Sequence, residues 1–418
     1  NEWQVEVEDG FKVRCRFLIT AIGILSKPLI PDFDGMEDFK GPSFHTAQWP
    51  HDEVVFTGKR VGIIGTGATA VQLIQEVAKT ADHLTVFQRS PNWCAPLHNG
   101  PIEPAEMADI RSRYDEIFER CRKSFSGFIH DSDERKALDV SEEEREALYE
   151  ELYASPGFGI WIGNFRDVLV DEAANATLSD FIARKIRERV DDGELAEKLI
   201  PRDHGFGTRR VPMETDYYEV YNQDNVLLVD VNETPIEKVT IDGIQCSDQE
   251  HPFDLIVYAT GFDAVMGPYK SIKFTGSDGR ILAEKWETGP STYLGLATAG
   301  FPNMFTLVGP HNASTFCNMP RCIEQNVEWV STFLEQLFDS DVTRVEVDID
   351  AEDEWTEHVY ESVQRMLFSK VDSWFMGVNK NIEGRDSRTF MLYVGGFPSY
   401  SERCDDVARD GYRGFIMS

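Results

Sequence analysis

The order of apolar and polar residues predicts a chain built from both strands and helices. Residues 3–7 and 11–15 alternate between apolar and polar side chains around Asp9 and Gly10, which predicts a β-hairpin. Short apolar runs that are rich in β-branched residues are typical of strands buried in a parallel sheet. Such runs occupy residues 17–22, 60–64, 83–88, 225–231 and 253–259.

Helical spacing of apolar residues occurs in three regions. It runs through residues 105–200, where charged residues dominate, and returns near 323–338 and 352–368. The first region predicts an α-helical insert with polar outer faces. Two interpretations of this insert remain open: a lid or wall beside a substrate, or a solvated scaffold.

A glycine-rich turn of the pattern G-x-G-x-x-A joins the run at 60–64 to an amphipathic helix. Gly65 permits a tight turn, Gly67 lets the backbone approach a pyrophosphate, and the small Ala70 lets the helix pack on the strand. The helix N-terminus also attracts phosphate groups. We therefore predict a dinucleotide site, the alternative being a turn that binds nothing. Its candidate residues are Gly65, Thr66, Gly67, Ala68, Thr69, Ala70 and Gln72.

The end of the next strand indicates which dinucleotide would bind. NAD enzymes usually carry Asp or Glu at this place, where the side chain meets the ribose hydroxyls. Here the chain continues with Arg89 and Ser90. A guanidinium can donate two hydrogen bonds to a 2′-phosphate, so the pattern favours NADP over NAD. The alternative is an arginine in a surface loop with no ligand.

Composition narrows the function classes. The chain has 418 residues, enough for two or three domains, and its 41 Lys and Arg residues against 73 Asp and Glu residues give a net charge of −32. Such acidity disfavours binding to nucleic acid or to an anionic membrane, although a local pair of arginines can still hold a phosphate. No apolar run is long enough for a membrane span, and no signal peptide is visible.

The seven cysteines give no metal or redox motif. Cys317 and Cys322 are the closest pair, but four residues between them and no second pair make a poor zinc pattern. No C-x-x-C pair is present, which argues against a disulfide reductase. We expect reduced thiols in a cytoplasmic protein and no metal site.

An aromatic motif before the glycine turn carries a family resemblance. Its fixed positions are Phe39, Gly41, His45, Trp49 and Pro50, and they resemble the F-x-G-x-x-x-H-x-x-x-W-P fingerprint of type I Baeyer–Villiger monooxygenases. Segments similar to that family follow over essentially the whole chain, at residues 205–210, 216–230, 258–264, 292–305, 373–374 and 390–396.

The resemblance implies a Rossmann-like α/β flavoprotein with two dinucleotide-binding domains and a helical insert. In this family the FAD domain begins with its own strand and G-x-G-x-x-G turn, whereas this sequence shows one such turn. We therefore expect the first FAD-binding βαβ unit to be missing before Asn1, and FAD to bind poorly or not at all. The implied parts are residues 1–24 (FAD-domain remnant), 25–96 and 205–257 (NADP domain), 97–204 (insert) and 258–418 (C-terminal FAD-domain part).

The resemblance also implies an activity: NADPH reduces FAD, oxygen is activated on the flavin, and one oxygen atom enters beside a ketone carbonyl to give an ester or lactone. The reacting oxygen species are anions and need a cation that does not donate a proton. Arginine suits this because its pKa lies above ~12. Arg210 matches the family's catalytic arginine, and Arg209 stands where relatives carry a lysine that reaches the 2′-phosphate.

Further roles follow from the same resemblance. Trp374 matches a tryptophan that contacts NADP, while Thr260, Gly261 and Met319 fall on the FAD side. Phe316 is expected to shape the substrate pocket. The fingerprint residues are assigned a domain-linking, conformational role and no chemistry.

Three alternatives stay open. A flavin monooxygenase that oxygenates nitrogen or sulfur carries a similar fingerprint but needs no arginine like Arg210. An inactive NADP-binding fragment would explain the single glycine turn. A plain NADP dehydrogenase fits least, because no hydride-transfer motif is recognisable. We expect a monomer whose partners are a small ketone and molecular oxygen.

Overall fold

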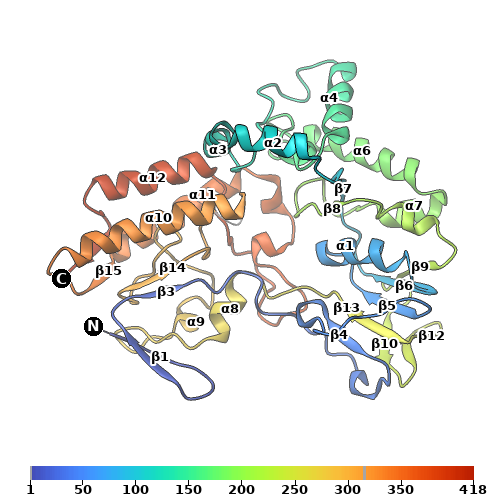
Figure 1. Cartoon of the computed structure of the whole chain (residues 1–418), viewed down its shortest axis with the longest axis horizontal. Helices are drawn as coiled ribbons and strands as arrows, with labels where there is room; N and C mark the ends of the chain where they lie inside the picture. Colours follow the sequence, from blue (N-terminus) through green and yellow to red (C-terminus); the bar gives the residue numbers. More distant parts are fainter. Residues whose placement is uncertain (1, 314–316) are drawn as a thin grey trace. The chain divides into compact units, whose positions relative to one another are not determined.

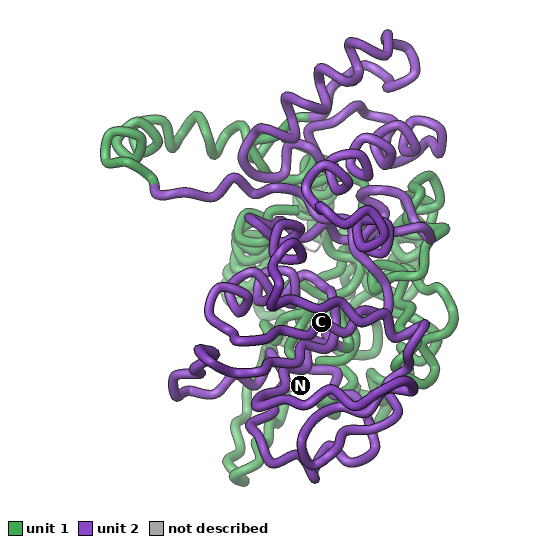
Figure 2. The backbone as a smooth tube through the Cα atoms, turned by 90° about the vertical axis from the view of Figure 1, so that its right-hand side faces the viewer, with its two compact units in different colours: residues 1–27, 102–131, 263–418 green, residues 28–101, 132–262 purple. Residues whose placement is uncertain are grey.

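A computed structural model of the chain describes residues 2–313 and 317–418, which form two compact units (Figure 2). Unit 1 comprises residues 1–27, 102–131 and 263–418, and unit 2 comprises residues 28–101 and 132–262. The helices expected between residues 97 and 204 are shared between the units, because residues 102–131 belong to unit 1. Within the described ranges, no helix has the length and apolar character needed to cross a membrane.

Unit 2 is organised around a five-stranded parallel sheet with the order β4-β13-β5-β6-β9 (Figure 1). This confirms the buried parallel strands predicted at 60–64, 83–88, 225–231 and 253–259. Apolar side chains on both faces suit strands that are covered on both sides. The five strands are β4 (Ser43–His45), β5 (Arg60–Ile64), β6 (His83–Gln88), β9 (Val226–Asp230) and β13 (Leu255–Tyr258).

The register of this sheet aligns the carboxyl ends of its central strands. Ile64 pairs with Phe87 and Gln88 pairs with Asp230, so the loops after β5, β6 and β9 emerge at one edge. Ligands of open parallel sheets bind at that edge, outside the strand ends. The sheet thereby places the glycine turn and the Arg89 loop side by side.

Helices and short strands complete unit 2. The hairpin sheet β10-β11-β12 is antiparallel and packs on the apolar cluster that holds Phe87, Phe253 and Ile256. Helix α4 begins with a capping box between Ser141 and Glu144, a sequence signal that stabilises a helix start. These elements are α1 (Ala68–Val77), β7 (Ala95–Pro96), α4 (Glu142–Ala154), α5 (Gly159–Ile162), α6 (Glu172–Arg189), α7 (Gly193–Leu199), β8 (Met213–Glu214), β10 (Ile236–Val239), β11 (Gly243–Cys246) and β12 (Glu250–Pro252), with 3-10 turns at Met36–Asp38, Thr46–Gln48 and Glu219–Asn222.

Unit 1 combines three two-stranded sheets with its helices. The predicted hairpin is confirmed, since β1 (Trp3–Glu6) pairs antiparallel with β2 (Lys12–Cys15). The predicted strand at 17–22 is β3 (Leu18–Thr20), which pairs in parallel with β14 (Met304–Thr306) across a long stretch of sequence. The other elements are α2 (Pro104–Ser112), α3 (Tyr114–Lys123), α8 (Met266–Ser271), α9 (Leu282–Lys285), α10 (Met319–Phe338), β15 (Val345–Val347), α11 (Ile349–Gln364), α12 (Phe397–Arg409) and β16 (Phe415–Met417), with 3-10 turns at Leu367–Lys370 and Trp374–Met376.

The core of unit 1 lies between its long helices and the β15–β16 sheet. The helices predicted near 323–338 and 352–368 are α10 and α11, and each presents an apolar face to this core. Phe333 of α10 stacks on Tyr412 with ring centroids 3.7 Å apart. The side chains of Met319 and Trp374 pack against this core.

Candidate functional site

The glycine turn after β5 has the conformation that its sequence predicts. Gly65 has φ +112°, and a Cβ there would lie 2.5 Å from the carbonyl oxygen of Ala259. Only glycine therefore fits without moving the neighbouring strand. Gly67 is the N-cap of α1 and is exposed, and a Cβ there would meet nothing within 4 Å.

The start of α1 suits a phosphate ligand. No side chain caps this helix, so the first N–H groups of α1 have no side-chain acceptor at the cap position. Ala68, Thr69 and Gln72 are exposed, whereas Ala70 is fully buried against the sheet. Exposed N–H groups at a helix N-terminus attract anions, so the turn can accept a phosphate group.

The loop after β6 is tied to this turn. Thr66 Oγ1 donates a 2.8 Å hydrogen bond to the carbonyl oxygen of Ser90. This contact joins two predicted candidates and holds Arg89, which is exposed, at the same edge of the sheet.

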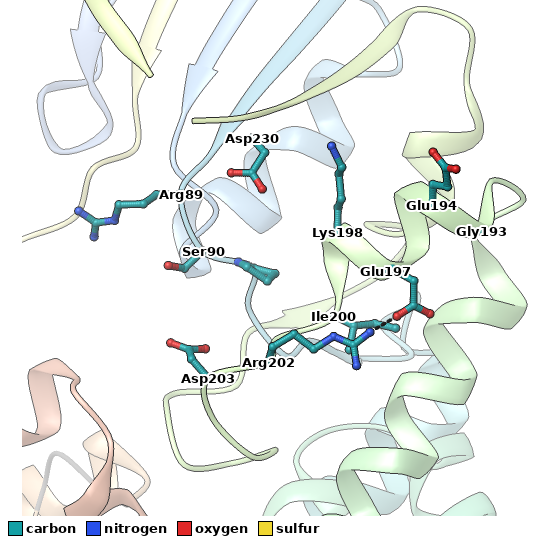
Figure 3. Close-up of a pocket in the computed structure, with 11 residues that line it drawn as sticks. Arg89, Ser90, Gly193, Glu194, Glu197, Lys198, Ile200, Arg202, Asp203 and Asp230 are labelled. Atoms are coloured by element: carbon teal, nitrogen blue, oxygen red, sulfur yellow. Dashed lines mark hydrogen bonds and ion pairs between the residues drawn. The ribbon is translucent and has the colours of Figure 1, made fainter. Parts of the chain in front are cut away.

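A cavity of about 720 Å³ opens beside this loop (Figure 3). Arg89 and Ser90 form part of its wall, while α7 and the segment after it supply the opposite residues. Figure 3 shows the Arg89 guanidinium extending away from Lys198 and Arg202. The lining residues are Arg89, Ser90, Pro91, Gly193, Glu194, Glu197, Lys198, Ile200, Arg202, Asp203 and Asp230.

Arg209 is connected to this cavity through Asp203. Its guanidinium donates a 2.8 Å hydrogen bond to Asp203 Oδ2, and His204 Nδ1 lies 2.6 Å from Asp203 Oδ1. The hydrogen bond with His204 and the charge of Arg209 hold the pKa of the Asp203 carboxyl well below its usual range. Burial lowers the pKa of His204. Asp203, which lines the cavity, thereby orients the Arg209 guanidinium.

Arg210 points into a different environment, an aromatic pocket within unit 2. Its guanidinium carbon lies 5.0 Å from the ring centre of Phe158 and 5.3 Å from that of Trp161, both within cation–π range. One guanidinium nitrogen donates a 2.8 Å hydrogen bond to the carbonyl oxygen of Val211. No carboxylate in the described part of the chain forms an ion pair with Arg210.

The loop before Arg210 explains this placement. Gly207 has φ +79°, and a Cβ there would lie 2.8 Å from the Trp161 ring. Trp161 also donates a 3.3 Å hydrogen bond from its indole nitrogen to the Gly207 carbonyl oxygen. Burial lowers the pKa of Arg210, although an arginine stays protonated at working pH. The result is a half-buried cation without an anionic partner.

The fingerprint residues lie on and around the edge strand β4. His45 is buried, and its Nδ1 accepts a 3.0 Å hydrogen bond from the Ala47 backbone, which caps the following 3-10 turn. Trp49 is 37% exposed, and its ring packs 4.8 Å from that of Phe44. Pro50 follows it, at an exposed position.

Gly41 in the same motif allows a close approach. A Cβ there would meet the Asp254 carbonyl oxygen and the Phe39 ring, each at 2.7 Å. Burial lowers the pKa of His45. These contacts lie within unit 2, and the conformational and domain-linking roles of the motif stay predictions.

Thr260 and Gly261 hold the backbone of Leu29, which is distant in sequence but belongs to the same unit. Thr260 Oγ1 donates a 2.6 Å hydrogen bond to the Leu29 carbonyl oxygen, and the Leu29 N–H donates to Gly261 O at 2.9 Å. Thr260 and Gly261 lie just after β13, which ends at Tyr258. The assignment of these residues to the FAD side stays a prediction.

Met319 and Trp374 belong to unit 1. Met319 is the first residue of α10, and Trp374 opens a 3-10 turn with its ring 4.5 Å from that of Phe375. Both side chains are partly buried against the core. Phe316 lies outside the described residues.

The cysteines beside Met319 differ from the expectation of reduced thiols. Cys317 and Cys322 form a disulfide, with Cα atoms 6.8 Å apart. The turn into α10 brings two residues together that are five apart in sequence, which the spacing rules for zinc and redox motifs do not predict. Cys15, Cys94, Cys121, Cys246 and Cys404 are free.

One group of possible metal ligands occurs in the described residues, on the β11–β12 hairpin. The candidate ligand atoms of Cys246, Asp248 and His251 lie within 4.8 Å of one another. Burial raises the pKa of the Cys246 thiol to about 11, and its side chain packs in the core of unit 2. The His251 ring packs edge-on against Phe87, so packing accounts for two of these side chains.

Sequence reasoning missed Lys198, Asp203 and Asp230. Lys198 and Asp203 belong to no motif and come from the region predicted as an insert, whereas Asp230 ends a family-like segment, 216–230, to which no site role was given. Asp230 had a usable signal, because it ends the strand that neighbours β6. The 2.8 Å hydrogen bond from the Gln88 side chain to the Lys198 carbonyl oxygen left no signal in the sequence.

Comparisons with known proteins show which sequences and structures this chain resembles. Residues 4–127 match the family model described as flavin-binding monooxygenase-like. A 2-oxo-Δ3-4,5,5-trimethylcyclopentenylacetyl-CoA monooxygenase of Pseudomonas putida is 49% identical over 422 residues, covering all of this chain and 77% of that protein. An acetone monooxygenase (methyl acetate-forming) of a Gordonia strain is 39% identical over 100% and 78% of the two chains.

Two further similarities bear on function. A phenazine N-monooxygenase of Lysobacter antibioticus is 40% identical, covering 99% of this chain and 76% of that protein. The solved structure of OTEMO in complex with FAD and NADP superposes with a TM-score of 0.96 at 48% identity, covering 100% of this chain and 78% of that one.

Proposed function

Because the chain belongs to the flavin-dependent Baeyer–Villiger monooxygenases, we propose that it acts on a cyclic ketone and that Arg210 stabilises the reacting oxygen anion. Enzymes of this family use NADPH, FAD and molecular oxygen to insert one oxygen atom beside a ketone carbonyl. The observation that supports this role is the environment of the Arg210 guanidinium. The residue is half-buried, its guanidinium lies near the rings of Phe158 and Trp161, and no described carboxylate forms an ion pair with it.

The charge of Arg210 suits a transient anion. A guanidinium away from water interacts more strongly with an anion than an exposed one does, and it cannot neutralise the anion by giving up a proton. Donors aimed at developing negative charge typically contribute ~3–4 kcal/mol to the transition state.

The NADP assignment is supported by the turn and the loop beside it. Gly65, Gly67 and the uncapped start of α1 suit the pyrophosphate, and Arg89 and Ser90 line the cavity at the strand ends. Arg209, fixed by Asp203, is proposed as a second cation for the 2′-phosphate. Trp374 is proposed to contact the nicotinamide half.

FAD supplies the oxygen-activating chemistry when it is bound. The described residues contain one turn of the G-x-G-x-x-A type, and we assign it to NADP, so no residue of this chain is assigned to the FAD pyrophosphate. Thr260, Gly261 and Met319 remain proposals for the flavin side.

Product analysis tests the function. In protein whose absorption spectrum shows bound FAD, NADPH and ¹⁸O₂ are expected to give at least one ester or lactone with one ¹⁸O atom from a panel of cyclopentanone, cyclohexanone and acetone. The proposed cyclic preference requires faster product formation from a ring ketone than from acetone. Oxidation of NADPH with hydrogen peroxide as the only product would contradict oxygen insertion.

Nitrogen oxygenation is the second candidate, because one relative at 40% identity is named for that reaction. A phenazine and a tertiary amine belong in the same panel. An N-oxide formed faster than any lactone, and unaffected by Arg210→Ala, would favour this candidate.

Monomeric state and a cytoplasmic location are proposed on the basis of composition alone. Light scattering of the purified protein checks the first, and cell fractionation checks the second. A stable dimer at micromolar concentration would contradict the monomer.

A further inference from the structure

The cavity beside Arg89 holds more negative than positive groups. Its wall carries the cations Arg89, Lys198 and Arg202, against the carboxylates of Glu194, Glu197, Asp203 and Asp230. The whole chain carries a net charge of −32. A 2′-phosphate brings about −1.5 to −2 charges at neutral pH, so it needs cations that are not already neutralised.

Arg202 already has an ion-pair partner in the cavity wall. It forms an ion pair with Glu197, drawn as a dashed line in Figure 3. The same carboxylate accepts a 2.6 Å hydrogen bond from Arg187 Nε. Glu197 thus holds two arginines, and a phosphate would have to compete with this cluster for Arg202.

Lys198 has a fixed backbone at the tip of β6. It lies in the last turn of α7, and its carbonyl oxygen accepts the 2.8 Å hydrogen bond from the Gln88 amide nitrogen. Gln88 directly precedes Arg89. The backbone of Lys198 is therefore anchored beside the residue that the sequence assigns to the phosphate.

The ammonium group of Lys198 has an exchangeable partner. Its Nζ lies 2.6 Å from Glu233 Oε2, and the Glu233 side chain is 62% exposed and not part of the cavity wall. Ion pairs at such exposed positions contribute little to stability. A lysine on a flexible stem can leave such a partner for a dianion.

We propose that Lys198 binds the 2′-phosphate of NADPH and contributes to discrimination against NADH. This inference rests on the proposed NADP site. It gives the helical insert a direct role in cofactor selection, since the cation comes from α7 and not from the strand–turn–helix segment that holds the glycine turn.

Binding of adenosine 2′,5′-bisphosphate and of 5′-AMP, measured by calorimetry, separates the phosphate from the rest of the cofactor. Lys198→Met is expected to weaken the bisphosphate at least fivefold while changing 5′-AMP less than twofold. Lys198→Arg keeps the charge and is expected to retain most of the affinity. Glu233→Gln removes the competing carboxylate and is expected to leave binding unchanged or make it tighter.

Lys79→Met is the matched control, because Lys79 is an exposed lysine just after the end of α1 and is paired with Glu76 at 2.7 Å. It is expected to bind both ligands like the unaltered protein. Circular dichroism melts check that every variant is folded.

The outcomes separate the two levels of the proposal. If the unaltered protein binds the bisphosphate no better than 5′-AMP, the NADP assignment itself fails. If it discriminates and Lys198→Met discriminates equally well, the NADP assignment stands and the role of Lys198 is wrong.

Discussion

The guanidinium of Arg210 and the guanidinium of Arg209 differ in their partners although they are adjacent in sequence. Arg209 donates to Asp203, whereas Arg210 lies near the rings of Phe158 and Trp161 and donates only to the Val211 carbonyl oxygen. The sequence predicted two arginines with separate roles, and the resemblance supplied the roles. Which of them has no carboxylate was not predictable, because Asp203, Phe158 and Trp161 carry no motif.

Replacement of Arg210 tests its role at the residue scale. In protein that has been loaded with FAD, Arg210→Ala is expected to lower the rate of ester or lactone formation by about a hundredfold to a thousandfold, which corresponds to the loss of ~3–4 kcal/mol of charge stabilisation. NADPH-dependent flavin reduction is expected to continue, since that step needs no oxygen anion. Stopped-flow absorbance and gas chromatography measure the two steps.

Arg113 is an exposed arginine between α2 and α3, and Arg113→Ala is the control that is expected to retain both steps. Arg210→Lys keeps a positive charge and is expected to fall between the two. Undiminished oxygenation in Arg210→Ala would remove this residue from the proposed role.

Replacement of Arg89 tests the choice of dinucleotide. A hydrogen bond to a charged group contributes ~1.5–3 kcal/mol, so Arg89→Ala is expected to raise the KM for NADPH roughly tenfold or more and to leave that for NADH nearly unchanged. Steady-state kinetics with both cofactors give the ratio. An unaltered ratio would show that Arg89 does not contact the phosphate.

At the scale of elements, the strand–turn–helix unit was predictable because its signals are local. The apolar run, the two glycines and the helical spacing all fall within 20 residues, and β5 and α1 follow them closely. The helical insert was predictable only as helices. Its division between the units and the contact between Gln88 and Lys198 depend on residues more than 100 positions apart.

The two glycines of the turn are expected to respond differently to alanine. Gly65→Ala forces φ +112° on a residue with a Cβ and brings that Cβ to 2.5 Å from the Ala259 carbonyl oxygen, so unfolding is expected to become easier by about 1–3 kcal/mol. Thermal melting and urea unfolding measure this loss.

Gly67→Ala meets open space at an ordinary φ of −76°, so its stability is expected to stay within about 0.5 kcal/mol. Its Cβ occupies the approach of the pyrophosphate, and NADPH affinity is expected to fall. A stable Gly67→Ala protein with undiminished NADPH affinity would argue against phosphate binding at this turn.

For the whole molecule, the burial of a titratable side chain makes the free energy of unfolding depend on pH. His311 is completely buried in unit 1; one ring nitrogen lies 3.1 Å from the Phe390 carbonyl oxygen and the other has no partner among the described residues. Burial lowers its pKa from 6.5 to about 4. Between pH ~4 and pH ~6.5 the His311 imidazole is therefore neutral in the folded chain, whereas in the unfolded chain it binds a proton.

This difference predicts a pH-dependent stability. Because the folded pKa is the lower one, the contribution is complete above pH ~6.5 and is lost as the pH falls toward 4, by an amount of about 3 kcal/mol. Urea unfolding from pH 7.5 to 4.5 is expected to show a steeper loss in the unaltered protein than in His311→Asn.

Asparagine is chosen because the backbone at His311 has φ +61°, which asparagine tolerates. His51→Asn, at an exposed position, is expected to keep the slope of the unaltered protein. Equal slopes in all three proteins would mean that His311 does not govern this part of the pH dependence.

The sequence by itself determined the α/β class, the parallel strands, the glycine turn and the family, because each depends on patterns within short stretches of chain. Only the packing of distant segments shows that Lys198 and Asp203 line a cavity beside Arg89, that no carboxylate among the described residues pairs with Arg210, and that Cys317 meets Cys322. The physical reason is that a side chain's pairing and burial depend on which distant segments pack around it, and local periodicity carries no record of that packing.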